Sequence, residues 1–295
     1  MSTININHLS FGFGDQQILQ DITTTFEPNT IYGLLGANGA GKSTLMNLIN
    51  NRLLAPANTI SLDSRNLTTD ADALHHLFLT SEANLYPKEM TIKKILGWMA
   101  HFYGDFDSAF AEKLLHAFEL KPKQKFGKLS TGYRSIFKAI IALCVPCDFV
   151  FLDEPTLGLD ASHRDLFYQA LMTTYAKRPR TFVIATHIID EVATLLEEVK
   201  IVKDGRLIRD MPLDDLLANT ALLSGPAEAV QQAIGQATVL STTSTGAMQQ
   251  VAVQGAYVTP LPLNVTKQGL TLQQLFVALT ATADLADLEV VSDAD

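Results

Sequence analysis

Short hydrophobic runs without charged residues recur along the chain and are typical of buried strands. Residues 31–35, 149–152 and 181–184 form such runs, and each run is followed by a loop that contains polar residues. Strands that are hydrophobic throughout are typical of parallel sheets covered on both faces. We therefore predict a parallel core sheet built from these segments.

Other patterns predict the parts around this sheet. In residues 4–8 hydrophobic side chains alternate with asparagines, and residues 23–26 are rich in threonine. Both segments are expected to be strands, the first an edge or antiparallel strand. Helical periodicity predicts helices over residues 91–103 and 107–120, with Asp107 as the N-cap of the second.

A further helix is predicted where Ser130, a good N-cap, precedes the periodic hydrophobic residues 136–143. Hydrophobic residues also gather just after residue 84. They form either an exposed docking surface or the core of a small helical subdomain, and the sequence leaves both interpretations open. These residues are Leu85, Tyr86, Pro87, Met90, Ile92, Ile95, Leu96, Trp98 and Met99.

The first domain is expected to end near residue 212. Residues 199–203 and 206–209 flank Asp204-Gly205, a strong signal for a β-hairpin. A short helix through residue 217 and then a strand, helix, strand, strand pattern are predicted beyond it. Thr271 and Gln274 form a capping box that opens a last helix, so residues 213–295 are expected to be a small α+β domain. It has no catalytic constellation, and a packing or dimer-stabilising role is favoured over ligand sensing.

Composition excludes several classes of function. The 295 residues have a net charge of −9, and residues 213–295 contain Lys267 as their one basic side chain. Without a basic stripe, a nucleic acid partner is not expected. No hydrophobic run reaches the ~18–20 residues needed to span a bilayer, and no signal peptide profile is present, so a cytosolic chain is expected. Cys144 and Cys147 are expected to be buried small side chains rather than a redox or zinc site.

Residues 36–43 have the sequence GANGAGKS, the phosphate-binding pattern GxxxxGK[ST], between a hydrophobic run and a helical stretch. Glycines let the backbone curl so that its N–H groups point at phosphates, and the helix start adds partial positive charge. Lys42 is expected to reach the β- and γ-phosphates, and the Ser43 hydroxyl to bind Mg²⁺. The pattern predicts a nucleoside triphosphate site.

Two carboxylates end the hydrophobic run 149–152. Ligands of open α/β sheets bind at the carboxyl ends of the strands, so Asp153 and Glu154 are expected beside the triphosphate. Asp153 is predicted to hold Mg²⁺ through water, and Glu154 to polarise the attacking water as a general base.

In their order along the chain, these motifs resemble the ATP-binding cassette (ABC) family of nucleotide-binding domains over about residues 1–210. The resemblance implies an α/β P-loop NTPase cassette over residues 1–212, with a parallel core sheet, an antiparallel β subdomain and a helical subdomain at about 83–145. Residues 129–133 (LSTGY) correspond to the family signature, and residues 157–160 (LGLD) to a loop at the dimer interface.

The resemblance also assigns residues. It implies that Phe13 stacks on adenine, unless Phe11 does so, and that His187 senses the γ-phosphate. It implies that Glu154, His187 and Lys42 are catalytic. The residues expected to contact nucleotide are Phe13, Asn38, Gly39, Ala40, Gly41, Lys42, Ser43, Thr44, Ser130, Gly132 and Asp160. The residues expected to bind the metal are Ser43, Asp153 and Glu82.

Two positions depart from the family pattern. Glu82 stands where the family usually has a glutamine that contacts Mg²⁺, and it adds a negative charge beside the γ-phosphate. In the signature, Thr131 replaces a glycine and Tyr133 a glutamine. Because Ser130 and Gly132 remain, we expect a working but slow ATPase.

The resemblance implies a function in which ATP and Mg²⁺ close a head-to-tail dimer, or a pair of cassettes, and hydrolysis reopens it. Integral membrane permease subunits would then perform transport, with export of a peptide, antibiotic or lipid expected by analogy. The chain would lie in the cytoplasm, peripheral to the inner face of the membrane. The alternatives are a soluble ABC ATPase without a transport role and a nucleotide-gated regulatory module of low turnover.

Overall fold

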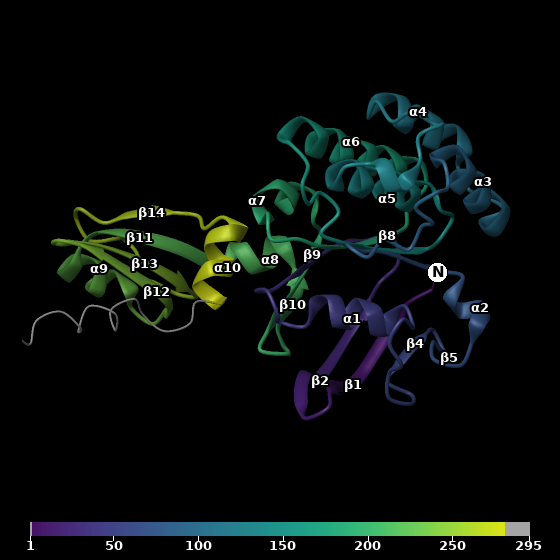
Figure 1. Cartoon of the computed structure of the whole chain (residues 1–295). Coiled ribbons are helices and arrows are strands. Elements are labelled where there is room, and N and C mark those ends of the chain that lie inside the picture. Colours follow the sequence, from purple (N-terminus) through teal and green to yellow (C-terminus); the bar gives the residue numbers. More distant parts are fainter. Residues whose placement is uncertain (1, 281–295) are drawn as a thin grey trace, which may run out of the picture. The chain divides into compact units, whose positions relative to one another are not determined.

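The computed structural model describes residues 2–280 and divides into two compact units, Met1–Asp210 and Met211–Asp295, which are described separately (Figure 1). Within the described residues, no helix is both long enough and hydrophobic enough to cross a membrane.

The first unit contains a six-stranded sheet with the order β10-β9-β3-β8-β7-β6. Its central strands β9, β3, β8, β7 and β6 are joined by parallel pairs, as predicted for the hydrophobic runs. The hairpin of β9 and β10 turns at Asp204 and Gly205, both with positive φ. The bounds are β3 Ile31–Leu35, β6 Leu77–Thr80, β7 Phe149–Asp153, β8 Thr181–Ala185, β9 Glu198–Lys203 and β10 Arg206–Pro212.

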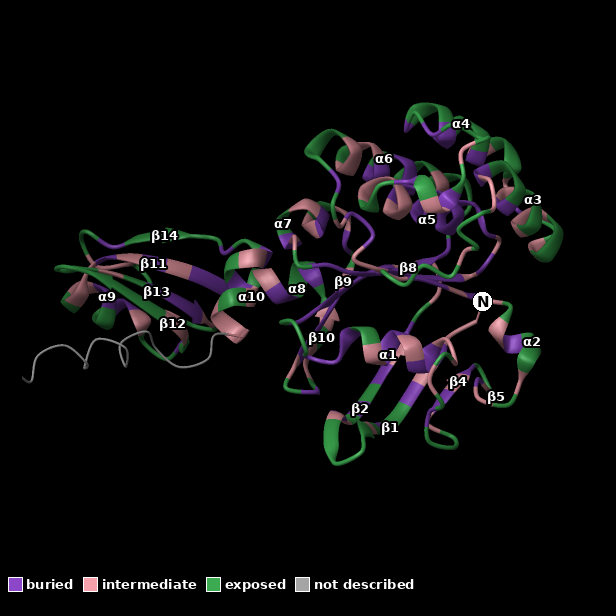
Figure 2. Cartoon of the chain, viewed as in Figure 1, coloured by how far each residue is buried: buried purple, intermediate pink, exposed green. Residues whose placement is uncertain are grey.

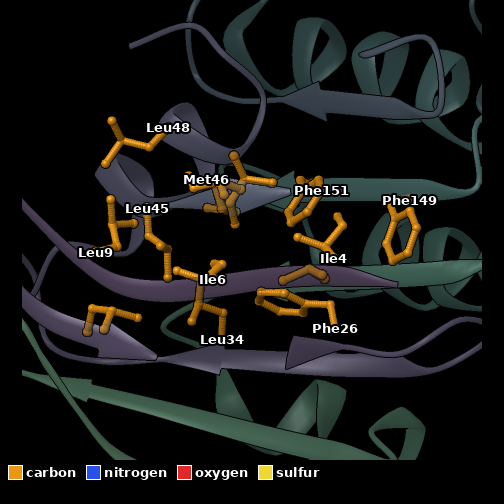
Figure 3. Packing of buried hydrophobic residues seen from close by; sticks show 14 of the residues in the cluster. Ile4, Ile6, Leu9, Phe26, Leu34, Leu45, Met46, Leu48, Phe149 and Phe151 are labelled. Carbon is orange, nitrogen blue, oxygen red and sulfur yellow. The ribbon is translucent and has the colours of Figure 1, made fainter. Parts of the chain in front are cut away.

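An antiparallel sheet with the order β2-β1-β4-β5 forms a second layer. It comprises β1 Ile4–Phe13, β2 Gln16–Phe26, β4 Ile60–Leu62 and β5 Arg65–Asn66. Strand β1 pairs with both β2 and β4, so it is an inner antiparallel strand and not an edge strand. Ile4, Ile6 and Phe26 pack with Leu45 and Met46 of helix α1 (Lys42–Ile49) in one hydrophobic cluster (Figure 3). This cluster fixes the helix that follows the phosphate-binding pattern.

Helices α3, α4, α5 and α6 lie on the opposite face of the six-stranded sheet from α1 (Figure 1). Thr91 caps α3, whose helix was predicted to include that residue, and Asp107 caps α4 as predicted from sequence. The bounds are α2 Ala71–Leu74, α3 Ile92–Tyr103, α4 Ser108–Ala117, α5 Thr131–Cys144, α6 Ala161–Lys177 and α7 Ile189–Val192, with 3-10 turns η1 Phe126–Lys128 and η2 Ala193–Leu195.

The hydrophobic residues after position 84 divide between the two interpretations left open by the sequence. Ile92 and Ile95 are buried in the helical subdomain, whereas Leu85 and Trp98 are 67% and 51% exposed. Figure 2 shows buried, intermediate and exposed residues along α3. At the end of α5, Cys144 and Cys147 are buried free thiols. Burial raises the pKa of each to about 12, in agreement with inert small side chains.

The second unit is a four-stranded antiparallel sheet with the order β12-β13-β11-β14. The predicted strand, helix, strand, strand pattern is present, whereas β14 was not predicted. Thr271 and Gln274 form the predicted capping box, since each backbone N–H donates to the other side chain. The bounds are α8 Leu213–Ala218, β11 Thr220–Pro226, α9 Ala227–Ile234, β12 Thr238–Thr245, β13 Met248–Gln254, β14 Thr266–Gln268 and α10 Leu272–Thr280.

An ion pair between a buried lysine and a partly exposed aspartate joins the two sheets of the first unit. Lys200 on β9 is 1% exposed, and its ammonium donates to Asp210 on β10 and, at 2.8 Å, to Thr24 on β2. Thr24 in turn donates to Asp210 at 2.6 Å. The rings of Phe26 and Tyr32 face the same ammonium, each with its centroid 4.9 Å from Nζ. Hydrogen bonds and ring faces therefore compensate the buried charge of Lys200, as a buried charge requires.

Replacing Lys200 by methionine is expected to lower the free energy of unfolding by about 2 kcal/mol, because Thr24 and the partly exposed Asp210 lose a charged hydrogen-bond donor. Urea unfolding followed by the fluorescence of Trp98, the chain's single tryptophan, measures the change in the first unit. Lys123→Met, at an exposed position, is the matched control. Identical unfolding curves for the two variants would show that the ion pair contributes nothing.

Candidate nucleotide-binding site

The carboxyl ends of four adjacent parallel strands open into one cavity. Strand β3 leads into the loop 36–41, β8 into His187, β7 into Glu154 and β6 into Glu82. The cavity has a volume of about 680 Å³. Its lining residues are Ile18, Asn38, Gly39, Gly41, Lys42, Ser43, Thr44, Asn47, Ser81, Glu82, Ala83, Asp153, Glu154, Leu157 and His187.

The loop before α1 depends on glycine at two points. Gly41 has φ +108°, and a Cβ there would lie 2.6 Å from the side chain of Leu19. A Cβ on Gly36 would lie 2.5 Å from the carbonyl oxygen of Val202. The backbone therefore curls tightly against β2 and β9, as expected of a loop that presents N–H groups to phosphate.

The Lys42 side chain lies inside this curl. Its ammonium donates to the carbonyl oxygens of Gly36, at 2.7 Å, and Ala37, at 3.1 Å. Burial lowers the pKa of Lys42, and the charges of Glu154 and Asp153 act in the opposite direction. A cation held only by neutral carbonyls can exchange them for phosphate oxygens, so the loop fits a triphosphate.

Three oxygen-bearing side chains, Ser43, Asp153 and Glu82, line the same cavity. Burial raises the pKa of Asp153, while a hydrogen bond with Ser43 lowers it. Within residues 2–280, no three His, Cys, Asp or Glu side chains cluster closely enough to hold a metal by themselves. Hydroxyl and carboxylate donors without a complete cage fit Mg²⁺, which keeps waters and shares phosphate oxygens.

Glu154 and His187 form a hydrogen-bonded pair. His187 Nδ1 lies 2.8 Å from Glu154 Oε2. Glu154 has φ +49°, a rare conformation for a residue other than glycine, and its N–H donates to Ala185 of β8 at 2.8 Å. The backbone of β8 thus fixes the backbone of Glu154, and His187 holds its carboxylate, which lines the same cavity as Lys42.

The residues of the signature and the loop 157–160 lie outside this cavity, except Leu157. Ser130 accepts from the N–H of Tyr133 at 3.3 Å and caps α5, as predicted. Asp160 caps α6 by accepting from the N–H of His163 at 2.9 Å. A Cβ on Gly132 would lie 2.7 Å from the carbonyl oxygen of Gly158, so the signature and this loop touch within one chain.

Phe13 and Ala40 also do not line the cavity. Phe13 ends β1, is 53% exposed and packs edge to face on Phe11.

Several residues that line the cavity were not predicted from the sequence. Ile18 comes from β2, which begins at Gln16 and not near residue 23. Asn47 lies one helical turn after Ser43 and donates to its carbonyl at 2.7 Å, a spacing that could have revealed it.

Comparisons with known proteins match part of this chain to the ABC transporter family. Residues 19–157 match the sequence profile of the ABC transporter family. The ABC transporter ATP-binding protein YtrB of Bacillus subtilis (strain 168) is 27% identical over 213 residues, 72% of this chain and 73% of that protein. The Nod factor export ATP-binding protein I of Burkholderia lata is 28% identical over 216 residues, 71% of each chain. Proteins named for arabinose and ribose import also match.

The fold has a counterpart among solved structures. The structure of an ATP-binding subunit of an ABC transporter superposes with a TM-score of 0.66 at 24% sequence identity, covering 73% of this chain and 92% of that one. This similarity supports the fold of the cassette, and the match does not extend over the whole chain.

Replacing Gly132 by alanine is expected to reduce the rate of ATP hydrolysis about tenfold, because overpacking against Gly158 displaces the start of α5. The affinity of the cavity for ATP should stay within about twofold, since Gly132 does not line it. Steady-state kinetics and equilibrium binding separate the two effects.

Gly97→Ala is the matched control, because no atom lies within 4 Å of a Cβ at that helical position. If Gly132→Ala and Gly97→Ala hydrolyse ATP equally fast, the contact between the signature and Gly158 has no role in turnover.

Proposed function

We propose that this chain, which belongs to the ABC transporter family as an ATP-binding, ATP-hydrolysing subunit, closes a head-to-tail dimer when it binds Mg-ATP and reopens it by hydrolysis, and that this cycle drives separate permease subunits. The observation that supports this most directly is the convergence of Lys42, Asp153, Glu154 and His187 on one cavity. Binding and cleaving a triphosphate needs a cation, oxygen donors and a base in this arrangement.

The residues have distinct roles in the proposed reaction. Lys42 neutralises charge on the terminal phosphates from inside the loop. Glu154 accepts a hydrogen bond from the attacking water and takes its proton, while His187 keeps the carboxylate oriented. When bound, Mg²⁺ supplies positive charge to the phosphate oxygens, and Ser43, Asp153 and Glu82 are the residues that would hold it.

A second copy of the cassette would complete the site. Ser130, Gly132 and Asp160 do not line the cavity of their own chain. The N-terminus of α5, a helix of 14 residues capped by Ser130, presents partial positive charge to an anion. Placed over the nucleotide of a partner, it would favour closure as long as the γ-phosphate is present. Phe13, exposed at the end of β1, remains our candidate for contact with adenine.

A hydrophobic groove of about 250 Å³ in the first unit supports the proposed permease contact. Leu85 and Phe102 line it and are 67% and 65% exposed. Arg52 also lines the groove and donates to the carbonyl of Leu79. An exposed hydrophobic groove bordered by a cation suits a short amphipathic segment of a membrane protein.

Export is the direction we propose, with the chain on the cytoplasmic face of the membrane. The Nod factor export protein matches over 71% of both chains, whereas the chain spans 44% of the arabinose import protein AraG of Rhizobium etli. The transported molecule would be a peptide, an antibiotic or a lipid.

Replacing Glu154 by glutamine is expected to slow ATP hydrolysis by about 10²- to 10⁴-fold, because the amide cannot take a proton. The variant should remain a dimer in saturating Mg-ATP, since the γ-phosphate persists. A phosphate-release assay measures the rate, and light scattering after size exclusion measures the mass.

Glu112→Gln, exposed on α4, serves as the control. Equal rates for the wild type and Glu154→Gln would favour the nucleotide-gated regulatory module instead. A monomeric Glu154→Gln protein in Mg-ATP, even beside its permease, would rule out the dimer mechanism.

Replacing Leu85 by glutamate is expected to abolish binding to the permease, because a charge enters a hydrophobic contact, while the free chain hydrolyses ATP normally. In inside-out vesicles that contain the permease, wild-type chain and external ATP should drive a labelled peptide or lipid into the lumen. Pull-down with the detergent-solubilised permease and uptake into the vesicles are the measurements.

Leu54→Glu, at a residue 76% exposed outside the groove, controls for added charge. Equal permease binding by both variants would exclude the groove as the docking site. ATP-driven loss of label from preloaded inside-out vesicles would reverse the proposed direction.

A further inference from the structure

Lys138 is a buried charge in the middle of α5. It lies about two helical turns after Ser130 and is 7% exposed among hydrophobic neighbours. Helical periodicity alone offers no reason for a lysine at a buried position, and burying an ammonium is costly unless it is compensated. The groups that compensate this charge therefore indicate the role of Lys138.

The ammonium of Lys138 donates to two backbone carbonyls beyond the end of β6. The acceptors are the oxygens of Ser81, at 2.6 Å, and Glu82, at 3.1 Å. Hydrogen bonds from a charged donor are stronger than those between neutral groups. The helix that begins at the signature thus holds the segment that presents Glu82 to the nucleotide cavity.

The charges around Lys138 are predominantly negative. A small cavity beside it is lined by Glu82, Asp153 and Glu154. Burial lowers the pKa of Lys138, the charge of Glu82 raises it, and Arg134 lowers it further. Lys42 faces Asp153 and Glu154 from the phosphate loop, so Lys138 is a second cation next to the carboxylates.

Glu82 adds a third carboxylate, after Asp153 and Glu154, to the lining of the nucleotide cavity. Its negative charge lies in the same cavity as the loop that would hold the terminal phosphate. Two negative groups close together in a partly buried site repel each other more strongly than they would in water. A nearby positive charge offsets this repulsion.

We propose that Lys138 is a positioning residue, which fixes the backbone of Ser81 and Glu82 and balances the charge of Glu82 so that Mg-ATP binds beside a carboxylate. This inference rests on the proposed function of the cavity. Lys138 would then link the helix that begins at the signature to the part of the cavity that would hold the γ-phosphate.

The test compares Lys138→Met and Lys138→Arg, each in the wild type and in the Glu82→Gln background. In the wild type, Lys138→Met should raise the Kd for Mg-ATP about tenfold, since a charge-assisted contact is lost, and Lys138→Arg should restore most of the affinity. In the Glu82→Gln background the same change should raise Kd less than about threefold, since no charge needs balancing.

Equilibrium titration with a fluorescent ATP analogue gives Kd independently of turnover. Hydrogen exchange of the peptide 80–86 reports whether the segment is held, and it should quicken in Lys138→Met in both backgrounds. If Lys138→Met does not fold, Lys138→Gln, which keeps a donor and removes the charge, replaces it with the same expectation for Kd.

An equal rise in Kd in both backgrounds, or none in either, would overturn the charge-balancing role. Unchanged exchange of the peptide 80–86 would overturn the positioning role. These results differ from a failure of the proposed function, in which the wild type itself does not bind Mg-ATP.

Discussion

Parallel hydrogen bonding between β3, β8, β7 and β6 is the constraint on which the site depends. Asp153 of β7 pairs in register with Ala185 of β8, and Gly33 of β3 with Ile184. Because parallel strands end at the same edge, four loops far apart in sequence must meet there. A shift of one residue in any pair would turn alternate side chains to the opposite face and separate the base from the phosphate loop.

Three buried lysines show how the same group serves different purposes. Lys200 meets a carboxylate and a hydroxyl with which its charge is fully matched, so it acts as a fixed link between sheets. Lys42 and Lys138 instead donate to backbone carbonyls, with carboxylates nearby. Neutral acceptors leave part of the positive charge uncompensated, which suits groups that act on an anionic ligand or on a neighbouring carboxylate.

The sequence predicts the parts in which local signals and the global fold agree. The phosphate loop, the strand before Asp153, the N-caps Asp107 and Ser130, and the capping box at Thr271 are visible because each needs only a few neighbouring residues. Short strands such as β4, β5 and β14 have no such signal, since pairing with distant segments forms them. Lys138 is invisible for a similar reason: its partners are carbonyls of a segment more than fifty residues away.

The segment after β6 borders every region that the proposed function must connect. Ser81 lines both the nucleotide cavity and the hydrophobic groove, and it accepts the hydrogen bond from α5. Packed interfaces shift between discrete arrangements and do not deform gradually. Under the proposed function, a permease segment in the groove and a nucleotide in the cavity would therefore act on the same few backbone atoms, and no extended path would be needed to connect the two binding events. The signature helix contacts this segment through Lys138, so all three responses would depend on where the backbone of Ser81 and Glu82 lies.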